Sequence, residues 1–223
     1  HLDHSGAIPL FHITRRVPVC LTKTTKELTD ILLKDFIKVS GHLLPYELID
    51  VKAMLKSCVI SKYNSWIRIK DCEIKLVRAG HIPGSAQIVV KTPDKTLLYT
   101  GDINFIDTKL MRRADDVLDK VDLAIVESTY GGTQHPDRNE LERRFIDKIE
   151  EVLERGGRVL VPSFAVGRSQ EILCILEDAH LDCDIYLDGM ARRVSIVLER
   201  YGREDLRDPE LYKRALRSAD WIG

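Results

Sequence analysis

The sequence predicts an α/β fold made of two halves that meet near Gly132. Two observations support this prediction. The first half contains many short segments of alternating or continuous apolar residues, which are typical of strands. In the second half, short apolar runs alternate with longer segments of helical periodicity, which is typical of parallel βαβ units. We therefore expect one domain over residues 1–131 and another over residues 132–223.

The first half is predicted to contain one long helix and then strands. Thr24 and Thr25 are expected to cap a helix that runs through Lys38, because apolar residues share one face and Gly41 follows its end. Alternation or apolar content then predicts strands at residues 65–70, 73–77, 88–92, 96–99 and 123–126. The last of these is a continuous apolar run, so we expect it to be fully buried.

The second half is predicted to alternate between helix and strand. An amphipathic helix is expected from about Asn139 to Arg155, followed by a buried strand over residues 158–162. A turn at residues 163–167 leads into a second helix. A strand at residues 184–187 then precedes a helix that begins near Met190.

The composition excludes several classes of protein. The apolar fraction of 44% allows a substantial core, and the formal net charge of -1 gives no overall attraction to nucleic acid. Any polyanion would have to be bound by local basic patches or a metal ion. No apolar run is long enough to span a bilayer, so we expect no membrane partner. The five cysteines lack C-x-x-C spacing, which favours free thiols in a cytoplasmic protein.

Three separate segments place histidine or aspartate beside small residues. They are His1-Leu2-Asp3-His4-Ser5-Gly6, the run A-G-H-I-P-G-S-A at residues 79–86, and Tyr99-Thr100-Gly101-Asp102. Imidazole nitrogens and carboxylate oxygens are zinc ligands. Each segment alone has a simpler interpretation, such as a core histidine or a turn cap. Together they predict a metal site whose ligands are His1, Asp3, His4, His81 and Asp102.

Three further residues are candidates for catalysis or substrate binding. Glu127 ends an apolar strand, where its carboxylate either has no role or orients a histidine and assists proton transfer. Arg168 begins a helix whose free N–H groups would grip a phosphate, although it could instead pair with Glu171. Ser163, in the turn before that helix, is a substrate-binding candidate with Arg168.

These motifs resemble the motif series of the metallo-β-lactamase superfamily, together with V-E-S-T-Y-G at residues 126–131. The run V-P-S-F-A-V-G-R-S-Q-E at residues 161–171 resembles the β-CASP branch of that superfamily. This branch includes the nuclease subunit of the cleavage and polyadenylation specificity factor, its archaeal relatives and RNase J. The resemblance covers nearly the whole chain.

The resemblance implies an αββα sandwich followed by the start of an inserted β-CASP domain, with two zinc ions between them. His1 and His81 would bind one zinc, Asp3 and His4 the second, and Asp102 would bridge both. Asp3 and Glu127 are then the catalytic candidates. The implied activity is that of a zinc-dependent ribonuclease in RNA processing or decay, endonucleolytic or 5′ to 3′ exonucleolytic. RNA is the expected substrate, and the expected assembly is a homodimer or an RNA-processing complex.

The chain also departs from the family pattern. The first histidine of an H-x-H-x-D-H motif would precede residue 1, and two later histidine motifs would follow Gly223. We therefore expect a fragment that lacks both ends and is inactive by itself. Two alternatives are a catalytically inactive scaffold subunit and a small-molecule metallo-hydrolase of the same superfamily. The filled ligand positions count against the first, and the β-CASP-like run counts against the second.

Overall fold

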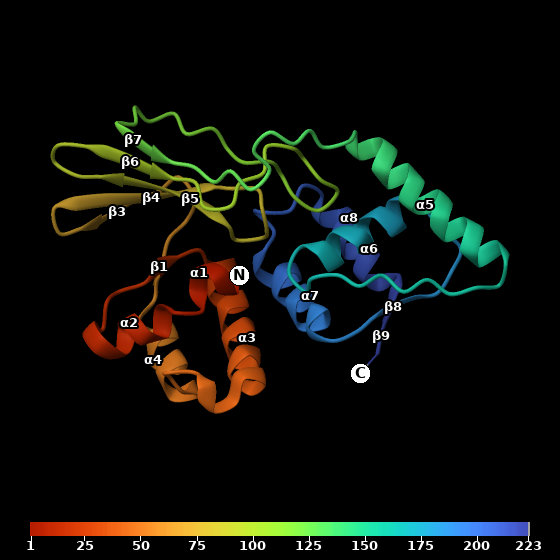
Figure 1. The fold of residues 1–223 in the computed structure, drawn as a ribbon, viewed down its shortest axis with the longest axis horizontal. Helices are drawn as coiled ribbons and strands as arrows, with labels where there is room; N and C mark the ends of the chain where they lie inside the picture. The colour runs from red at the N-terminus through yellow and green to blue at the C-terminus, as the bar shows by residue number, and fades with distance from the viewer. Residues whose placement is uncertain (223) are drawn as a thin grey trace.

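A computed structural model describes residues 1–222 as a mixed α/β structure (Figure 1). A five-stranded sheet lies above the helices of the N-terminal region, and further helices with a two-stranded sheet form the other end of the molecule (Figure 1). The α/β prediction is confirmed. The αββα layering that the motif resemblance implies stays a prediction.

The five-stranded sheet has the strand order β3-β4-β5-β6-β7. Its strands are β3 (Trp66–Ile69), β4 (Cys72–Arg78), β5 (Ala86–Lys91), β6 (Thr96–Tyr99) and β7 (Leu123–Ile125). Strands β3 to β6 pair antiparallel with one another, whereas β7 pairs in parallel with β6. All five strands lie where the sequence pattern places them, within two residues at each end.

The prediction that the strand near residue 123 is fully buried is wrong. Leu123 and Ile125 are each 53% exposed, and Val126 after the strand is 60% exposed. β7 lies at the edge of the sheet with β6 as its one neighbour. A continuous apolar run indicates a strand with two covered faces, but here both faces of β7 remain open within the described chain.

Helices precede the sheet in sequence and lie beneath it in Figure 1. This region consists of α1 (Leu2–Ser5), α2 (Ile8–Arg15), β1 (Cys20–Leu21), α3 (Lys23–Ser40), a 3-10 turn (Gly41–Leu43), α4 (Leu48–Ser57) and β2 (Val59–Ile60). α3 and α4 bury a small apolar core that includes Leu33, Val51 and Met54. The cap of α3 is Thr22, whose Oγ1 accepts the N–H of Thr25 at 3.1 Å. The prediction of Thr24 or Thr25 as the cap is therefore wrong by two to three residues.

The second half contains four helices and a short parallel sheet. Its elements are α5 (Arg138–Glu154), α6 (Arg168–Asp178), β8 (Ile185–Leu187), α7 (Met190–Tyr201), α8 (Pro209–Arg217) and β9 (Ala219–Trp221). β8 and β9 pair in parallel, which confirms the expected parallel arrangement in this half. The helices expected near residues 139, 168 and 190 are confirmed.

The buried strand predicted over residues 158–162 is wrong. This segment has no regular secondary structure, and Leu160 is 89% exposed. No strand among residues 1–222 pairs with it, so its backbone is not held in a ladder and its apolar side chains face solvent. The apolar run alone could not show whether a partner strand would be present.

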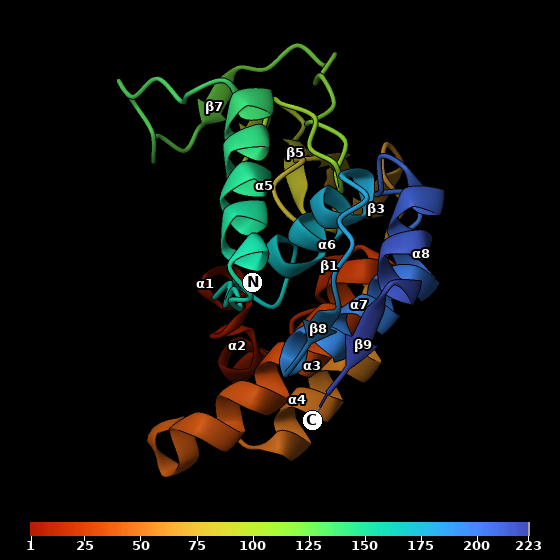
Figure 2. The same ribbon diagram turned by 90° about the vertical axis from the view of Figure 1, so that its right-hand side faces the viewer.

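The two halves share one core. The larger cluster of buried residues combines Leu28 of α3 with residues of α6, α7 and α8, among them Cys174, Leu198 and Tyr212. α3 and α7 lie side by side, as Figures 1 and 2 both show. The predicted boundary near Gly132 stays a prediction. Within residues 1–222, no helix has the length and apolar character needed to cross a bilayer.

Candidate metal centre

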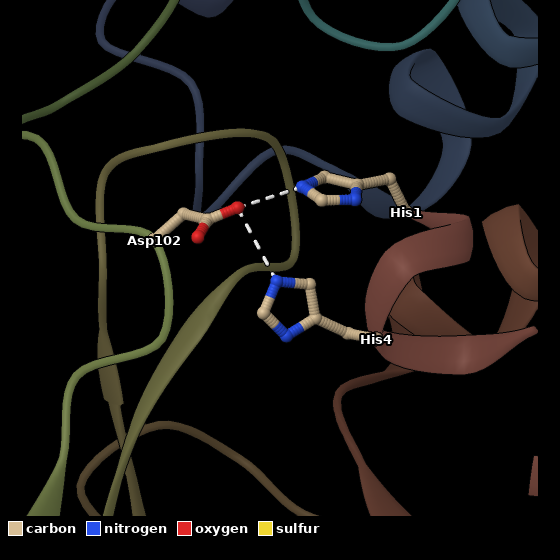
Figure 3. A group of neighbouring side chains, drawn as sticks. All are labelled: His1, His4 and Asp102. Carbon is tan, nitrogen blue, oxygen red and sulfur yellow. Dashed lines mark hydrogen bonds and ion pairs between the residues drawn. The ribbon is translucent and has the colours of Figure 1, made fainter. Parts of the chain in front are cut away.

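Three histidines from two segments converge on one aspartate oxygen. Nε2 of His1 lies 2.8 Å from Oδ2 of Asp102, and Nε2 of His4 lies 3.3 Å from the same oxygen (Figure 3). Nε2 of His81 lies 3.5 Å from it. The structure thus brings together four of the five predicted metal ligands, which lie up to 101 residues apart in sequence.

The backbone at Gly80 and Gly101 makes this convergence possible. Both glycines precede a candidate ligand, and both have a positive φ, +71° and +56°, which side chains rarely adopt. A Cβ at Gly80 would lie only 2.7 Å from the carbonyl oxygen of Asn104. Glycine therefore allows the loop that carries His81 to pack against the segment that follows Asp102.

His1 and His4 lie at the start of α1, three residues apart, so their side chains project from the same side of one helical turn. Their rings are 4.9 Å apart between centroids. The Ser5 hydroxyl donates to the carbonyl of His1 at 2.9 Å, and Tyr46 donates to the carbonyl of Gly6 at 2.5 Å. The first bond closes the helical turn itself, and the second ties its end to the helical region that follows.

The donor set fits a zinc ion. The ligand atoms of His1, His4 and Asp102 all lie within 4.8 Å of one another. Zinc bonds of about 2.0–2.2 Å at tetrahedral angles separate neighbouring ligand atoms by roughly 3.3–3.5 Å. The contacts of Asp102 with His4 and His81 have this spacing, whereas the contact with His1 is a shorter hydrogen bond.

The electrostatics of the cluster favour the protonation states that a metal requires. Burial lowers the pKa of His81, even though Asp102 raises it. Burial raises the pKa of Asp102, but hydrogen bonds from His1 and His4 outweigh this effect and the net shift is downward. A neutral imidazole and an ionised carboxylate are the metal-binding forms of these groups. Both shifts therefore extend those forms to lower pH.

Asp3 is the predicted ligand that the structure does not bring into the cluster. Its side chain is 87% exposed, and its carboxylate lies 3.6 Å from Nδ1 of His1, the ring nitrogen that does not face Asp102. The four convergent residues describe a site for one ion. The second zinc, and the roles of Asp3 as its ligand and in catalysis, stay predictions.

Glu127 lies beside the cluster and binds the backbone that follows Asp102. Its Oε1 accepts the N–H of Ile103 at 3.1 Å, and its Oε2 accepts the N–H of Thr129 at 3.0 Å. Hydrogen bonds from Thr129 and from the N–H of Ile103 lower the pKa of Glu127. The carboxylate is thus held ionised next to the Asp102 loop. Its proposed part in proton transfer stays a prediction.

Arg168 and Ser163 flank the start of α6. Arg168 is exposed, and among residues 1–222 its guanidinium forms no hydrogen bond or ion pair. The alternative that it pairs with Glu171 is not found, because Glu171 binds Arg138 and the N–H groups of Lys109 and Leu110 instead. Ser163 is exposed and shares a 2.9 Å hydrogen bond with Ser169.

α6 begins next to the loop that carries His81. Gly167, its N-cap, has a φ of +81°, and a Cβ there would lie 3.1 Å from a side-chain carbon of Ile82. Val166 also lines a cavity of about 220 Å³ with all four convergent residues. The exposed guanidinium of Arg168 is therefore carried by a helix that packs against the candidate metal centre.

Thr22 and Thr25 hold the loop that follows His81. The sequence predicted only a helix cap at Thr24 or Thr25 and no contact with this loop. The hydroxyls of Thr22 and Thr25 both donate to the carbonyl of Gly84, at 3.1 and 2.7 Å. They tie the start of α3 to the loop after His81. Threonines before an amphipathic helix indicate a helix cap. They do not indicate a contact with Gly84, which lies about 60 residues further along the chain.

Comparisons with known proteins show what the chain resembles as a whole. It is 45% identical to a protein named "Probable RNase MJ4" from Methanocaldococcus jannaschii, over all of this chain and 53% of that protein. It is 38% identical to "RNase aCSPSF2" from Saccharolobus solfataricus, over all of this chain and 45% of that protein. The chain is similar along its full length to archaeal proteins named as RNases. No protein-family model matches it.

A further relative has a different name. The chain is 37% identical to "Transcription termination factor FttA" from Pyrococcus abyssi, over 97% of this chain and 35% of that protein. The names of these relatives indicate the archaeal branch of the family whose motifs the chain resembles. The chain spans about half the length of the first two relatives.

Proposed function

We propose that the chain belongs to a zinc-dependent ribonuclease of the β-CASP metallo-β-lactamase family that acts in RNA processing or decay. The observation that carries this proposal is the convergence of three imidazole nitrogens within 3.5 Å of Oδ2 of Asp102. Full-length similarity to archaeal proteins named as RNases supports RNA as the substrate.

The residues of the site have distinct tasks under this proposal. His1, His4, His81 and Asp102 hold the metal, and Asp3 completes a second site with His4. A bound zinc supplies hydroxide near neutral pH and stabilises negative charge on phosphoryl oxygens. Glu127 keeps the Asp102 loop in place through the N–H of Ile103.

The path of the RNA is proposed from the position of α6. Arg168 is exposed at the start of that helix, where the helix dipole also favours an anion. Arginine binds phosphate through two parallel N–H groups. Arg168, with Ser163 nearby in sequence, would hold a backbone phosphate of the strand that reaches the metal centre.

The test is cleavage of single-stranded RNA by the protein purified over its full natural length. We expect cleavage that stops on addition of a chelator and returns with zinc. Labelling the 5′ and 3′ ends separately distinguishes internal cuts from stepwise release of nucleotides. Cleavage that continues at the same rate after complete removal of metal would contradict the proposal, as would a metal-loaded protein that leaves RNA intact.

A further inference from the structure

Four arginines line an open cavity of about 380 Å³ outside the candidate metal centre. They are Arg78 at the end of β4, Arg112 and Arg113 in the segment after Asp102, and Arg207 before α8. Neither the sequence motifs nor the proposed metal centre uses this cavity. Its lining combines four arginines with three aspartates, so the excess charge is positive and favours an anion.

Arg78 lines the cavity, and its guanidinium already forms bonds within the protein. Its guanidinium pairs with Asp115 at 2.8 Å and donates to the carbonyl of Glu204 at 2.8 Å. It also lies over the ring of Tyr63, 5.3 Å from the centroid. Arg207 donates to the carbonyl of Thr108 at 3.1 Å. These two arginines are therefore fixed in place by the protein itself.

Arg112 and Arg113 differ from the other two arginines because their charges are not engaged. Both side chains are exposed, and within residues 1–222 neither guanidinium has a hydrogen bond or an ion pair. Two adjacent arginines repel each other in the absence of a counter-ion. A bound anion would relieve that repulsion and accept several N–H donors at once.

The aspartates of the cavity do not neutralise it. Asp115 pairs with Arg78, and the carboxylate of Asp107 accepts the backbone N–H of Arg113 at 2.7 Å. Asp116 is the third aspartate that lines the cavity. Four arginines and three aspartates leave one net positive charge, and two of the three carboxylates are occupied within the protein.

The segment with the two arginines is rigidly held next to the metal centre. The N–H of Ala114 donates to Asn104 at 2.7 Å, and the N–H of Asn104 donates to Ala79 at 2.9 Å. Met111 forms a β-bridge with Leu206 of the second half. The arginine segment is therefore packed between the loops of His81 and Asp102 and the second half. Such pre-positioning lowers the cost of binding an extended ligand.

We propose that this cavity binds backbone phosphates of an RNA strand whose scissile bond lies at the metal centre, with Arg112 and Arg113 as the phosphate contacts. This inference rests on the proposed function. Guanidinium groups recognise phosphate geometry and carry no base preference, so the contact would add affinity without adding sequence specificity. It would act on a strand long enough to reach from the metal centre to the cavity.

The test compares two double variants of equal charge change. Arg112→Gln with Arg113→Gln removes the proposed contacts. Arg143→Gln with Arg144→Gln is the matched control, because this adjacent pair is exposed on α5 and forms no ion pair within the described chain. Affinity for a fluorescent single-stranded RNA is measured by anisotropy over a range of salt concentrations, with a chelator present to prevent cleavage.

We expect the cavity variant to bind RNA roughly tenfold more weakly at low salt, because two phosphate contacts are lost. The slope of log affinity against log salt concentration should fall by about 1.4. The control variant should keep the affinity and slope of the natural protein.

Two outcomes would overturn the inference while leaving the proposed function intact. One is a cavity variant with unchanged affinity and salt slope. The other is an equal loss in both variants, which would show that only the overall charge matters. Melting temperatures that match the natural protein establish that the variants fold. A natural protein that neither binds nor cleaves RNA would overturn the proposed function as well.

Discussion

Glu127 contacts the backbone beside the candidate metal centre rather than a candidate ligand side chain. Its two oxygens accept N–H groups on either side of the site, one from the residue directly after Asp102. Groups that orient metal ligands contribute to affinity although they never touch the ion. The structure therefore assigns Glu127 a positioning contact, in addition to the proton-transfer role expected from its place after a strand.

We predict that Glu127→Gln weakens zinc binding roughly 10–100-fold, the usual effect of losing such an outer contact. Glutamine turns one carboxylate oxygen into an N–H2 group, which cannot accept the N–H of Ile103 or Thr129. Calorimetric titration with zinc measures the change. Glu73→Gln, a substitution on β4, serves as the control. Unchanged zinc affinity in Glu127→Gln would rule out the positioning role.

Asp205 is a second carboxylate with an unusual environment. It is 1% exposed and accepts the hydroxyl of Tyr63 at 2.7 Å. Burial raises its pKa above the ordinary value of 3.8. A group whose pKa is higher in the folded state binds its proton more tightly there. Its contribution to stability is complete below pH 3.8 and is lost as the pH rises through the raised pKa.

We therefore predict that the natural protein loses stability relative to Asp205→Asn as the pH rises from about 4 toward neutral. Asparagine cannot ionise, so the difference between the two proteins isolates this one group. Urea unfolding at a series of pH values measures it, with the exposed residue changed in Asp94→Asn as the control. A stability difference that stays constant, or that moves in the opposite direction with pH, would show that Asp205 is not responsible.

The sequence identified His1, His4, His81 and Asp102 because their neighbours are small residues in a recurring pattern. The sequence did not show that the Asp3 side chain points away from the cluster, because a motif does not determine the direction of an exposed side chain. It also could not identify Asp205 or Thr22, whose roles depend on contacts with residues more than 60 positions away.

At the scale of elements, Glu171 of α6 joins three parts of the chain. Its buried carboxylate accepts the N–H groups of Lys109 and Leu110, at 3.0 and 2.7 Å, and binds Arg138 of α5. The segment after Asp102 is thus held by a residue of the second half. Removing the carboxylate leaves the N–H groups of Lys109 and Leu110 without their acceptor, whereas Arg138 keeps its ion pair with Glu142.

We predict that Glu171→Ala lowers the free energy of unfolding by about 2–4 kcal/mol, because two backbone N–H groups lose a charged acceptor. Glu151→Ala is a suitable control, because Glu151 pairs with Lys148 and Arg155 on the exposed face of α5. Such surface pairs contribute about 0–1 kcal/mol. Chemical denaturation of both variants tests the difference, and similar losses in the two would show that the buried network has no special importance.

Strands and helices could be predicted from local patterns, but their environments could not. β7 and residues 158–162 have the apolar character of buried strands, yet both are exposed within the described chain. Burial requires a neighbouring element, and a local pattern does not show whether that neighbour exists. The cap of α3 was missed for a related reason, since several threonines in sequence could each have served.

At the scale of the molecule, the two halves form one packed unit around the candidate metal centre. α3 lies beside α7 and shares a core with it, and the segment after Asp102 is bridged to residue 206. The motif order in the sequence predicted that distant segments would meet. The shared core could not be predicted, because it depends on which helix faces contact each other.

We propose that the cluster around Asp102 is a zinc centre. The most direct measurement is the zinc content of the protein and of Asp102→Asn after dialysis against low zinc, by elemental analysis. Asp71→Asn, in an exposed turn, is the control. We predict that the natural protein and the control retain zinc, whereas Asp102→Asn loses it, because all three imidazoles converge on that carboxylate. Full zinc retention in Asp102→Asn would show that this cluster does not hold the zinc.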